Sequence, residues 1–353
     1  MRALAVALTG GLLPAASAAR IEVSWRLLPA APLAARSGHS ATWTGREMVV
    51  FGGAGKDGEF ADGAAYSPAT GTWRRIRRAP LVPREGHVAV WTGRELLVWG
   101  GGAEGMLRTF ADGAAYEPHK NRWRRLARSP LSARFGHSGV WTGKELVIFG
   151  GFTSADESGE AAAYDPRRDS WRTLAGWRGR HGHAAVWTGR EMVVWGGDGP
   201  QEHERDGAAY DPRRDRWRPL PLSPLEGRVQ HSAVWTGTEL LVVGGASNLR
   251  LRVESAAFQP QTNRWRHLPD SPAGWPSAHR AVWTGSRLIV WGGASGGGSY
   301  EPTMNRWETL PAVPLRARIE HTAVWTGRAM LVWGGESCPD ACFDGDGAAF
   351  VVG

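Results

Sequence analysis

The sequence predicts an all-β fold in which seven four-stranded units close into one ring. The 353-residue chain contains 48 glycines and 22 prolines, which suit turns between short strands and disrupt long helices. One phrase recurs seven times, and the two ends of the chain carry complementary halves of one unit. With 42% apolar and 22% charged residues, the composition is that of a folded protein. No apolar run is long enough to predict a membrane-spanning helix.

The recurring phrase begins with a histidine, passes through Trp-Thr-Gly and enters an apolar stretch that ends in Gly-Gly. In the first copy the phrase reads HSATWTG and the apolar stretch covers residues 48–53. A variable segment then leads to Tyr66 and, seven positions later, to Trp73. This pattern predicts four strands per unit: A after the histidine, B into Gly-Gly, C with the aromatic residue and D with the tryptophan. The seven histidines are His39, His87, His137, His183, His231, His279 and His321.

The repeated pattern of R-x-x-H, a strand ending in Gly-Gly, and Tyr and Trp seven apart resembles the kelch repeat. It covers nearly all of residues 21–353. The resemblance implies a seven-bladed kelch-type β-propeller, in which each repeat is a four-stranded blade around a central channel. It further implies a single domain over residues 20–353 and a secreted protein of the bacterial type. No copy buries both of its faces alone, so neighbouring blades have to stack.

The two ends of the repeat region complete one another. The seventh copy stops at residues 349–353 without its tryptophan strand, whereas residues 21–28 contain Trp25 without a preceding C strand. We therefore predict that the N-terminal strand is the outermost strand of blade seven. Closing the ring in this way removes an exposed strand edge.

The N-terminus has the pattern of a secretory signal peptide. Residues 3–16 are apolar, and Ala16-Ser17-Ala18 supplies a small-x-small cleavage site. Residues 1–19 are therefore predicted to be a signal peptide, and the protein is predicted to be secreted or periplasmic.

The two cysteines, Cys338 and Cys342, lie four residues apart in one segment. In an oxidising compartment this spacing favours a local disulfide. The alternative is a metal site completed by nearby aspartates, but C-x3-C without a histidine is not a usual zinc spacing. The sequence thus predicts a disulfide, no metal and no cofactor.

Segment lengths distinguish two faces of the predicted ring. The A–B turns, such as residues 44–47, and the C–D turns, such as residues 68–71, keep one length throughout and form what we call the constant face. The B–C segments, such as residues 54–62, vary in length, and they share the opposite, variable face with the D–A segments, such as residues 76–86. Because binding residues concentrate on loops held by a rigid scaffold, we expect function on the variable face.

A charge pair is part of the repeat. An arginine precedes the histidine by three positions and an acid precedes the C-strand aromatic by four, and blade six lacks both. Because blade six has lost both the arginine and the acid, we infer that the two side chains contact each other. We therefore predict a structural Arg–carboxylate bridge in each of the other blades. The pairs are Arg36 with Asp62, Arg84 with Asp112, Arg134 with Glu160, Arg180 with Asp206, Arg228 with Glu254, and Arg318 with Asp346.

Blade six departs most from the repeat, because its B–C segment is short and its charge pair is gone. Tryptophans on loops are typical ligand anchors, and two here stand outside the template. A notch between longer loops is therefore the predicted ligand site, although Trp177 also fits a packing residue where most repeats have Leu. The candidate ligand-binding residues are Trp275, Arg250, Arg252, Asp344 and Trp177.

The seven template histidines form a ring near the channel, which leaves two interpretations. Such a ring binds an ion or transfers protons, or each histidine satisfies a hydrogen bond in its own blade. We favour the second interpretation because a residue present in every blade rarely serves one central ligand.

The predicted function is an extracytoplasmic binding or interaction module that recognises a glycan or protein partner through its variable face. The alternative is a cofactor-independent sugar mutarotase or epimerase, as in related six-bladed kelch proteins. The resemblance to galactose oxidase does not extend to its chemistry, since all five tyrosines occupy the C-strand position and both cysteines lie in one segment. A third hypothesis is a cell-surface scaffold that uses Arg-rich outer strands such as residues 73–78.

The net charge of +8 attracts polyanions in general. All but three of the 42 basic residues are arginines spread along the chain, which we interpret as a solvated surface without a specific nucleic-acid site. The sequence further predicts a monomer without integral membrane association.

Overall fold

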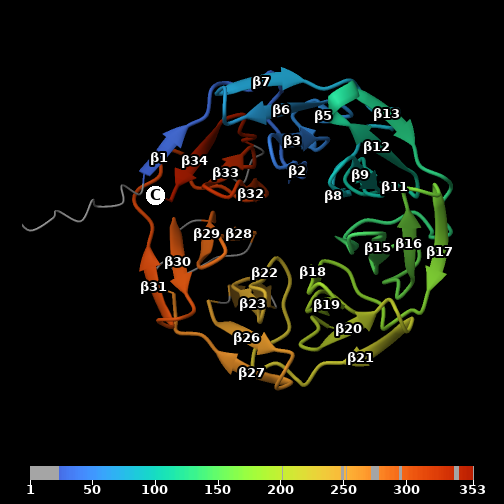
Figure 1. The fold of residues 1–353 in the computed structure, drawn as a ribbon, viewed down its shortest axis with the longest axis vertical. Helices are drawn as coiled ribbons and strands as arrows, with labels where there is room; N and C mark the ends of the chain where they lie inside the picture. The colour runs from blue at the N-terminus through green and yellow to red at the C-terminus, as the bar shows by residue number, and fades with distance from the viewer. Residues whose placement is uncertain are drawn as a thin grey trace, which may run out of the picture.

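The computed structural model describes residues 24–200, 202–247, 250–251, 253–271, 278–293, 296–337 and 342–352, with the backbone alone at 250 and 251. Seven four-stranded antiparallel sheets are arranged in a ring (Figure 1), and we refer to the centre of this ring as the channel. The predicted all-β, seven-bladed propeller is thus confirmed. Within the described ranges, no helix has the length and apolarity needed to cross a membrane.

Each blade contains its strands in the order A to D from the channel outward (Figure 1). Blades one to three are β2 (Ser40–Trp43), β3 (Met48–Phe51), β6 (Gly63–Ser67) and β7 (Thr72–Arg75); β8 (Val88–Trp91), β9 (Leu96–Trp99), β12 (Gly113–Glu117) and β13 (Arg122–Arg125); and β14 (Ser138–Trp141), β15 (Leu146–Phe149), β16 (Ala161–Asp165) and β17 (Ser170–Leu174). Blades four to six are β18 (Ala184–Trp187), β19 (Met192–Trp195), β20 (Gly207–Asp211) and β21 (Arg216–Pro219); β22 (Ser232–Trp235), β23 (Leu240–Val243), β26 (Ser255–Gln259) and β27 (Arg264–His267); and β28 (Arg280–Trp283), β29 (Leu288–Trp291), β30 (Gly297–Glu301) and β31 (Arg306–Thr309). Blade seven is β32 (Thr322–Trp325), β33 (Ala329–Trp333), β34 (Gly347–Val351) and β1 (Ser24–Leu27).

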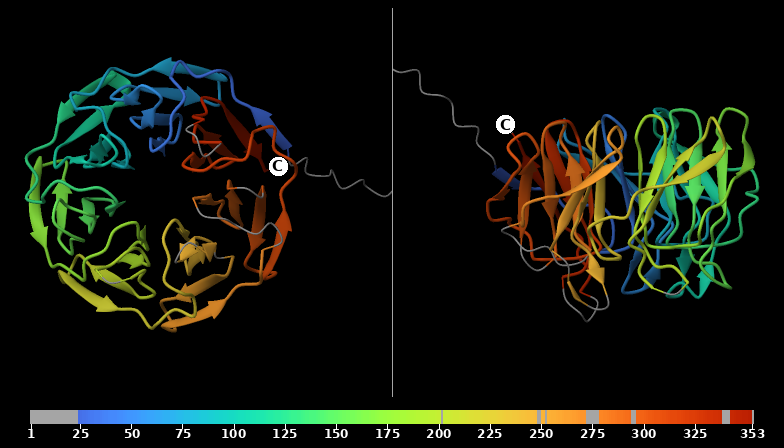
Figure 2. Two further views of the ribbon diagram at one scale, coloured as in Figure 1. Left: turned by 180° about the vertical axis from the view of Figure 1, so that it is seen from behind. Right: turned by 90° about the horizontal axis from the view of Figure 1, so that it is seen from below.

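Three B–C segments and one C–D turn add short elements to this scheme. The B–C hairpins are β4 (Ala54–Gly55) with β5 (Gly58–Glu59), β10 (Gly102–Ala103) with β11 (Arg108–Thr109), and β24 (Ala246–Ser247) with β25 (Arg250–Leu251). A 3-10 helix, η1 (Pro118–Lys120), forms the C–D turn of blade two. The edge view in Figure 2 shows the constant and variable faces at opposite ends of the blades.

The ring closes as predicted, through the N-terminal strand. Strand β1 pairs antiparallel with β34, and Trp25 lies opposite Phe350. Strand β1 is therefore the D strand of blade seven.

A repeated hydrogen bond joins the blades at the outer rim. The indole Nε1 of each D-strand tryptophan donates to a backbone carbonyl of the preceding blade, over 2.6 to 3.2 Å. At the closure, Trp25 donates to the carbonyl of Pro311 over 3.2 Å, as Trp265 does to that of Pro221 over 2.9 Å. The seam that closes the ring therefore uses the same bond as the other seams.

The template histidines form the inner part of the same seams. His87 stands edge-on to Phe51, with ring centroids 5.3 Å apart, and its Cε1 would lie 2.7 Å from a Cβ at Gly52. Any side chain at Gly52 would therefore collide with the histidine, and the backbone φ of +67° also favours glycine there. This fit explains why an aromatic residue, Gly-Gly and a histidine recur together.

The hydrogen bonds of these histidines cross from blade to blade. Nε2 lies 2.8 Å from Ser40 Oγ at His87, 2.7 Å from Ser138 Oγ at His183 and 2.8 Å from Thr322 Oγ1 at His39. Each of these partners belongs to the preceding blade, so the expectation of a bond within the histidine's own blade is wrong. Each of these histidines lies at the edge of its blade, so the side-chain hydroxyl that it reaches belongs to the neighbouring blade.

Burial keeps these imidazoles neutral. Desolvation, followed by the nearby arginines or histidines, lowers the histidine pKa to about 3 at His39, His87 and His137. A neutral, buried imidazole contributes no charge to the channel.

Candidate functional site

The six charge pairs fix the loops of the variable face. Arg36 Nη1 lies 2.8 Å from Asp62 Oδ1 and donates to the carbonyl of Gly52 over 3.0 Å. The bridge therefore ties a D–A segment to the ends of strands B and C. Nitrogen–oxygen distances are 2.8 Å for Arg84–Asp112, 2.7 Å for Arg180–Asp206, 3.6 Å for Arg228–Glu254 and 2.7 Å for Arg318–Asp346, and Arg134 also bonds Glu160.

The predicted blade-six notch falls largely outside the described residues. Trp275, Arg252 and Cys338 lie outside them, and Arg250 is described only as backbone in β25. The notch and the disulfide therefore stay predictions. No described cysteine is a free thiol.

The other two candidate ligand residues are engaged within the fold. Trp177 is half-buried, and its ring packs 6.0 Å from that of Trp217 in the core between blades three and four. Asp344 lies 3.5 Å from the guanidinium of Arg318 and accepts a hydrogen bond from Ser337. The structure places Trp177 and Asp344 in different blades and does not bring them together.

The position two residues before each template histidine lies where the chain enters the innermost strand. At the six of these positions that the structure describes, the backbone pairs antiparallel with the first residue after Gly-Gly, as Ser37 does with Ala54. The backbone is therefore the same from blade to blade while the side chain differs. We call these residues the channel-mouth positions: Ser37, Glu85, Phe135, His181, Val229 and Ile319.

The mouth is acidic over blades seven, one and two. Ser37 Oγ donates to the carboxylate of Glu336, and Glu85 packs against Gly38, where an added Cβ would lie 2.6 Å from Glu85 Oε2. Burial, followed by the charges of Glu59, Glu320 and Glu336, raises the pKa of Glu85 to about 7. In a protein of net charge +8, this is a local region of opposite sign.

The mouth is aromatic over blades three and four. Phe135 and Phe152 have ring centroids 5.6 Å apart, and His181 stands edge-on to both. Asp198 accepts from Nδ1 of His203 and lies 3.7 Å from Nε2 of His181. Among the residues that the structure describes, no three His, Cys, Asp or Glu side chains are grouped so that they could hold a metal ion.

The residue between the channel-mouth position and the histidine adopts a left-handed conformation. Blades one to four use glycine there, with φ near +60°, whereas Gln230, Ala278 and Glu320 carry φ of +55°, +62° and +53°. Left-handed backbone at residues with a side chain costs on the order of 1 kcal/mol each. These three residues lie at the mouth of blades five to seven.

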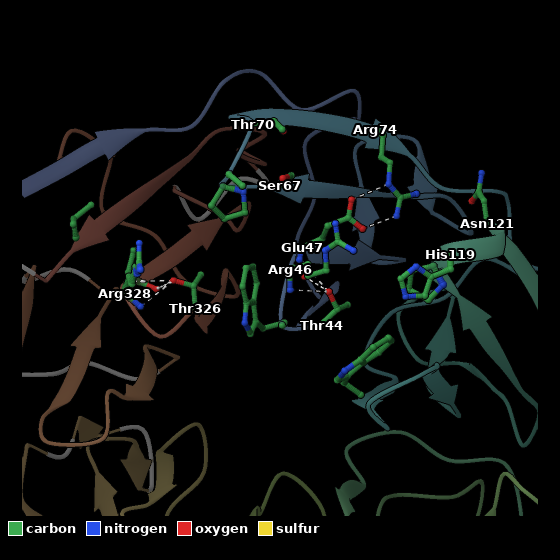
Figure 3. A pocket seen from close by; sticks show the side chains of 18 residues that line it. Thr44, Arg46, Glu47, Ser67, Thr70, Arg74, His119, Asn121, Thr326 and Arg328 are labelled. Atoms are coloured by element: carbon green, nitrogen blue, oxygen red, sulfur yellow. Dashed lines mark hydrogen bonds and ion pairs between the residues drawn. The ribbon is translucent and has the colours of Figure 1, made fainter.

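The constant face contains a pocket of roughly 950 Å³ where blades seven, one and two meet. Figure 3 shows Thr44 and Arg46 on one turn, with Thr326 and Arg328 on a second turn to one side of them and His119 to the other side. Sequence reasoning missed this pocket because it treated turns of fixed length as featureless. The missed signal was the identity of single residues within those turns.

Comparison with known proteins agrees with the repeats and the fold. A family model described as the KLHDC2/KLHL20/DRC7 Kelch-repeats domain matches residues 86–293, more than half of the chain. Among curated proteins, none matches the chain. The described blades extend the same architecture to both sides of the matched range. The chain therefore belongs to the kelch-repeat family.

Proposed function

We propose that this kelch propeller is an extracytoplasmic protein-interaction module that binds its partner at the mouth of the variable face. Kelch propellers generally bind protein partners. The observation that carries the proposal is the set of channel-mouth positions, where one backbone geometry presents a serine, an acid, an aromatic residue, a histidine and aliphatic residues. A repeated scaffold with one varied position creates a surface specific for one partner.

The chemistry of the mouth favours a partner segment that joins a basic and an apolar side chain. The acidic half offers Glu85 and Glu336 to a lysine or arginine, and the aromatic half offers Phe135 and Phe152 to an apolar residue. Leu107 and Ile319, with 90% and 40% of their surface exposed, extend the apolar contacts on this face. The extracytoplasmic location rests on the predicted signal peptide, which the N-terminal sequence of the exported protein tests.

Selection of peptides against the purified protein tests the proposal. We expect random dodecapeptides displayed on phage to be enriched in Lys or Arg next to an aromatic or aliphatic residue. The Glu85→Gln/Glu336→Gln variant should bind such a peptide at least tenfold more weakly by fluorescence anisotropy. Because burial keeps Glu85 partly protonated near neutral pH, affinity should also rise between pH 6 and pH 8.

The control variant, Asp156→Asn/Glu202→Gln, removes the same charge from exposed loops on the same face. It should keep the wild-type affinity. Enrichment of acidic or uncharged peptides, or equal loss in the two variants, would contradict the proposed site.

A further inference from the structure

The pocket on the constant face holds arginines that have no acidic partner. Arg46 and Arg328 occupy the same position in the A–B turns of blades one and seven, and both line the pocket (Figure 3). Both side chains are exposed, and neither forms an ion pair with any residue that the structure describes.

Blade two shows which partner these two arginines lack. There the equivalent Arg94 lies 3.8 Å from Glu117, at the end of strand C. Ser67 and Val351 stand at the position of Glu117 in blades one and seven, and both line the pocket. The acid is therefore lost in two adjacent blades, at the place where the pocket lies.

A second substitution adds to the positive charge. In blade one, Glu47 neutralises Arg74 through two hydrogen bonds of 2.9 and 2.6 Å, which also raise the pKa of Arg74. In blade seven Ala329 replaces this glutamate, and Arg26 on β1 is the exposed equivalent of Arg74. The seam between blades seven and one thus carries an excess of cations.

The remaining lining residues suit a sugar. Trp43 and Trp91 contribute half-buried indoles, whose apolar faces match the faces of sugar rings. Ser67, Thr70 and Asn121 supply hydroxyl and amide groups for sugar hydroxyls. A nucleic acid would instead require a longer cationic track with stacked bases.

We propose that this pocket binds an anionic saccharide, whose carboxylate or sulfate groups contact Arg46 and Arg328. Arginine is the residue best suited to such oxyanions because its planar fork binds two oxygens at once. The site lies on the face opposite the channel-mouth positions, so it is independent of the protein-binding function proposed above.

Isothermal titration calorimetry with three probes tests the proposal. The probes are a heparin hexasaccharide, a galacturonic acid trisaccharide and neutral maltohexaose. We expect one or both anionic probes to bind, which distinguishes sulfate from carboxylate recognition, and the neutral probe to bind at least tenfold more weakly. Binding should weaken as salt increases.

Two variants locate the site. Ser67→Glu restores the acid that blade two has, so it should pair with Arg46 and weaken binding at least tenfold without removing a cation. Arg46→Ala/Arg328→Ala should do the same. The matched control, Lys144→Ala/Arg190→Ala, removes two exposed cations from equivalent turns of blades three and four and should bind as the wild type does.

Several outcomes would overturn the proposal. These are no binding of either anionic probe at millimolar concentration, equal binding of maltohexaose, and equal weakening in the control variant, which would show only general attraction to a basic face. A different ligand class would be indicated if single-stranded DNA or phosphatidylserine vesicles bound as tightly as the anionic saccharides and if Ser67→Glu weakened that binding as much. Unchanged melting temperature and peptide binding at the channel mouth establish that each variant is folded and separate this test from that of the proposed function.

Discussion

The arginines of the six charge pairs are buried while their acids are not. The side chain of Arg180 has no exposed surface, whereas Asp206 keeps 19% of its side-chain surface exposed and Glu254, the partner of Arg228, keeps 46%. Burial lowers the pKa of Arg36, Arg84 and Arg134, which shows that their charge is held at a cost. The acid matters mainly because removing it leaves a buried cation without compensation.

Neutralising the better-buried acid should therefore destabilise the protein more. We expect Asp206→Asn to lower the free energy of unfolding by about 2–3 kcal/mol, because the bond from Arg180 is 2.7 Å and largely shielded from water. Glu254→Gln should cost less than about 1 kcal/mol, because the pair is 3.6 Å apart and solvent screens it. Urea denaturation of both variants measures the difference, and equal losses would mean that the burial of the pair does not set its contribution.

At the scale of elements, the seam between neighbouring blades is the structural unit that repeats. Each seam contains the outer tryptophan bond. In six of the seven seams an inner histidine also packs on an aromatic residue, whereas Val243 takes the aromatic position between blades five and six. Strand β1 contributes the equivalent tryptophan, Trp25, to the seam that closes the ring, although β1 comes from the other end of the chain. Closure of the ring therefore depends on the register of β1 against β34, and the closing seam uses the same kind of tryptophan hydrogen bond as the other seams.

This equivalence predicts equal effects of one substitution in two seams. Trp25→Phe removes the indole N–H that bonds Pro311, and Trp265→Phe removes the one that bonds Pro221. Both variants should lose about 1 kcal/mol of unfolding free energy, the usual net value of one hydrogen bond. Thermal and urea unfolding measure both. A loss at Trp265 without one at Trp25 would show that the closing seam does not carry the bond.

For the whole molecule, the ring of buried histidines sets the response to acid. Their folded pKa, about 3 at His39, His87, His137 and His231, lies below the unfolded value near 6.5. The unfolded chain therefore takes up more protons as the pH falls from about 6.5 toward 3, and stability is lost in that window. Glu85 acts in the opposite sense between about pH 4.5 and 7, because its folded pKa is raised, but it is one group against several.

We therefore expect the melting temperature to fall steeply between pH 6.5 and pH 4. In that range each buried histidine contributes a slope of up to about 1.4 kcal/mol per pH unit. His231→Phe removes one such group and should flatten the slope of unfolding free energy against pH by about that amount. A melting temperature that stays constant from pH 6.5 to 4 would show that these histidines are protonated in the folded protein.

The sequence predicted what repeats and could not predict what depends on single departures from the repeat. The histidine phrase and the lone strand around Trp25 predicted the ring and its closure, and spacing paired arginines such as Arg36 with their acids. Repeats do not show which neighbour a blade-edge side chain meets, so the cross-blade bond of His87 was missed. The pocket was missed because it arises from Ser67 and Val351, two positions notable only for the acid they lack.

The pairing of β1 with β34 has a consequence for how the chain is made. Strand β1 is the first of the described strands to be synthesised, yet its partner is the last. Six blades have all four of their strands before β1 can pair with β34. Until then the ring is open at blade seven, and one strand edge is unpaired on each side of the opening. Closing that gap joins the most distant parts of the sequence, which is the slow kind of step in folding. Until β34 is made the ring stays open, and incompletely folded chains with unpaired strand edges are in general prone to aggregation.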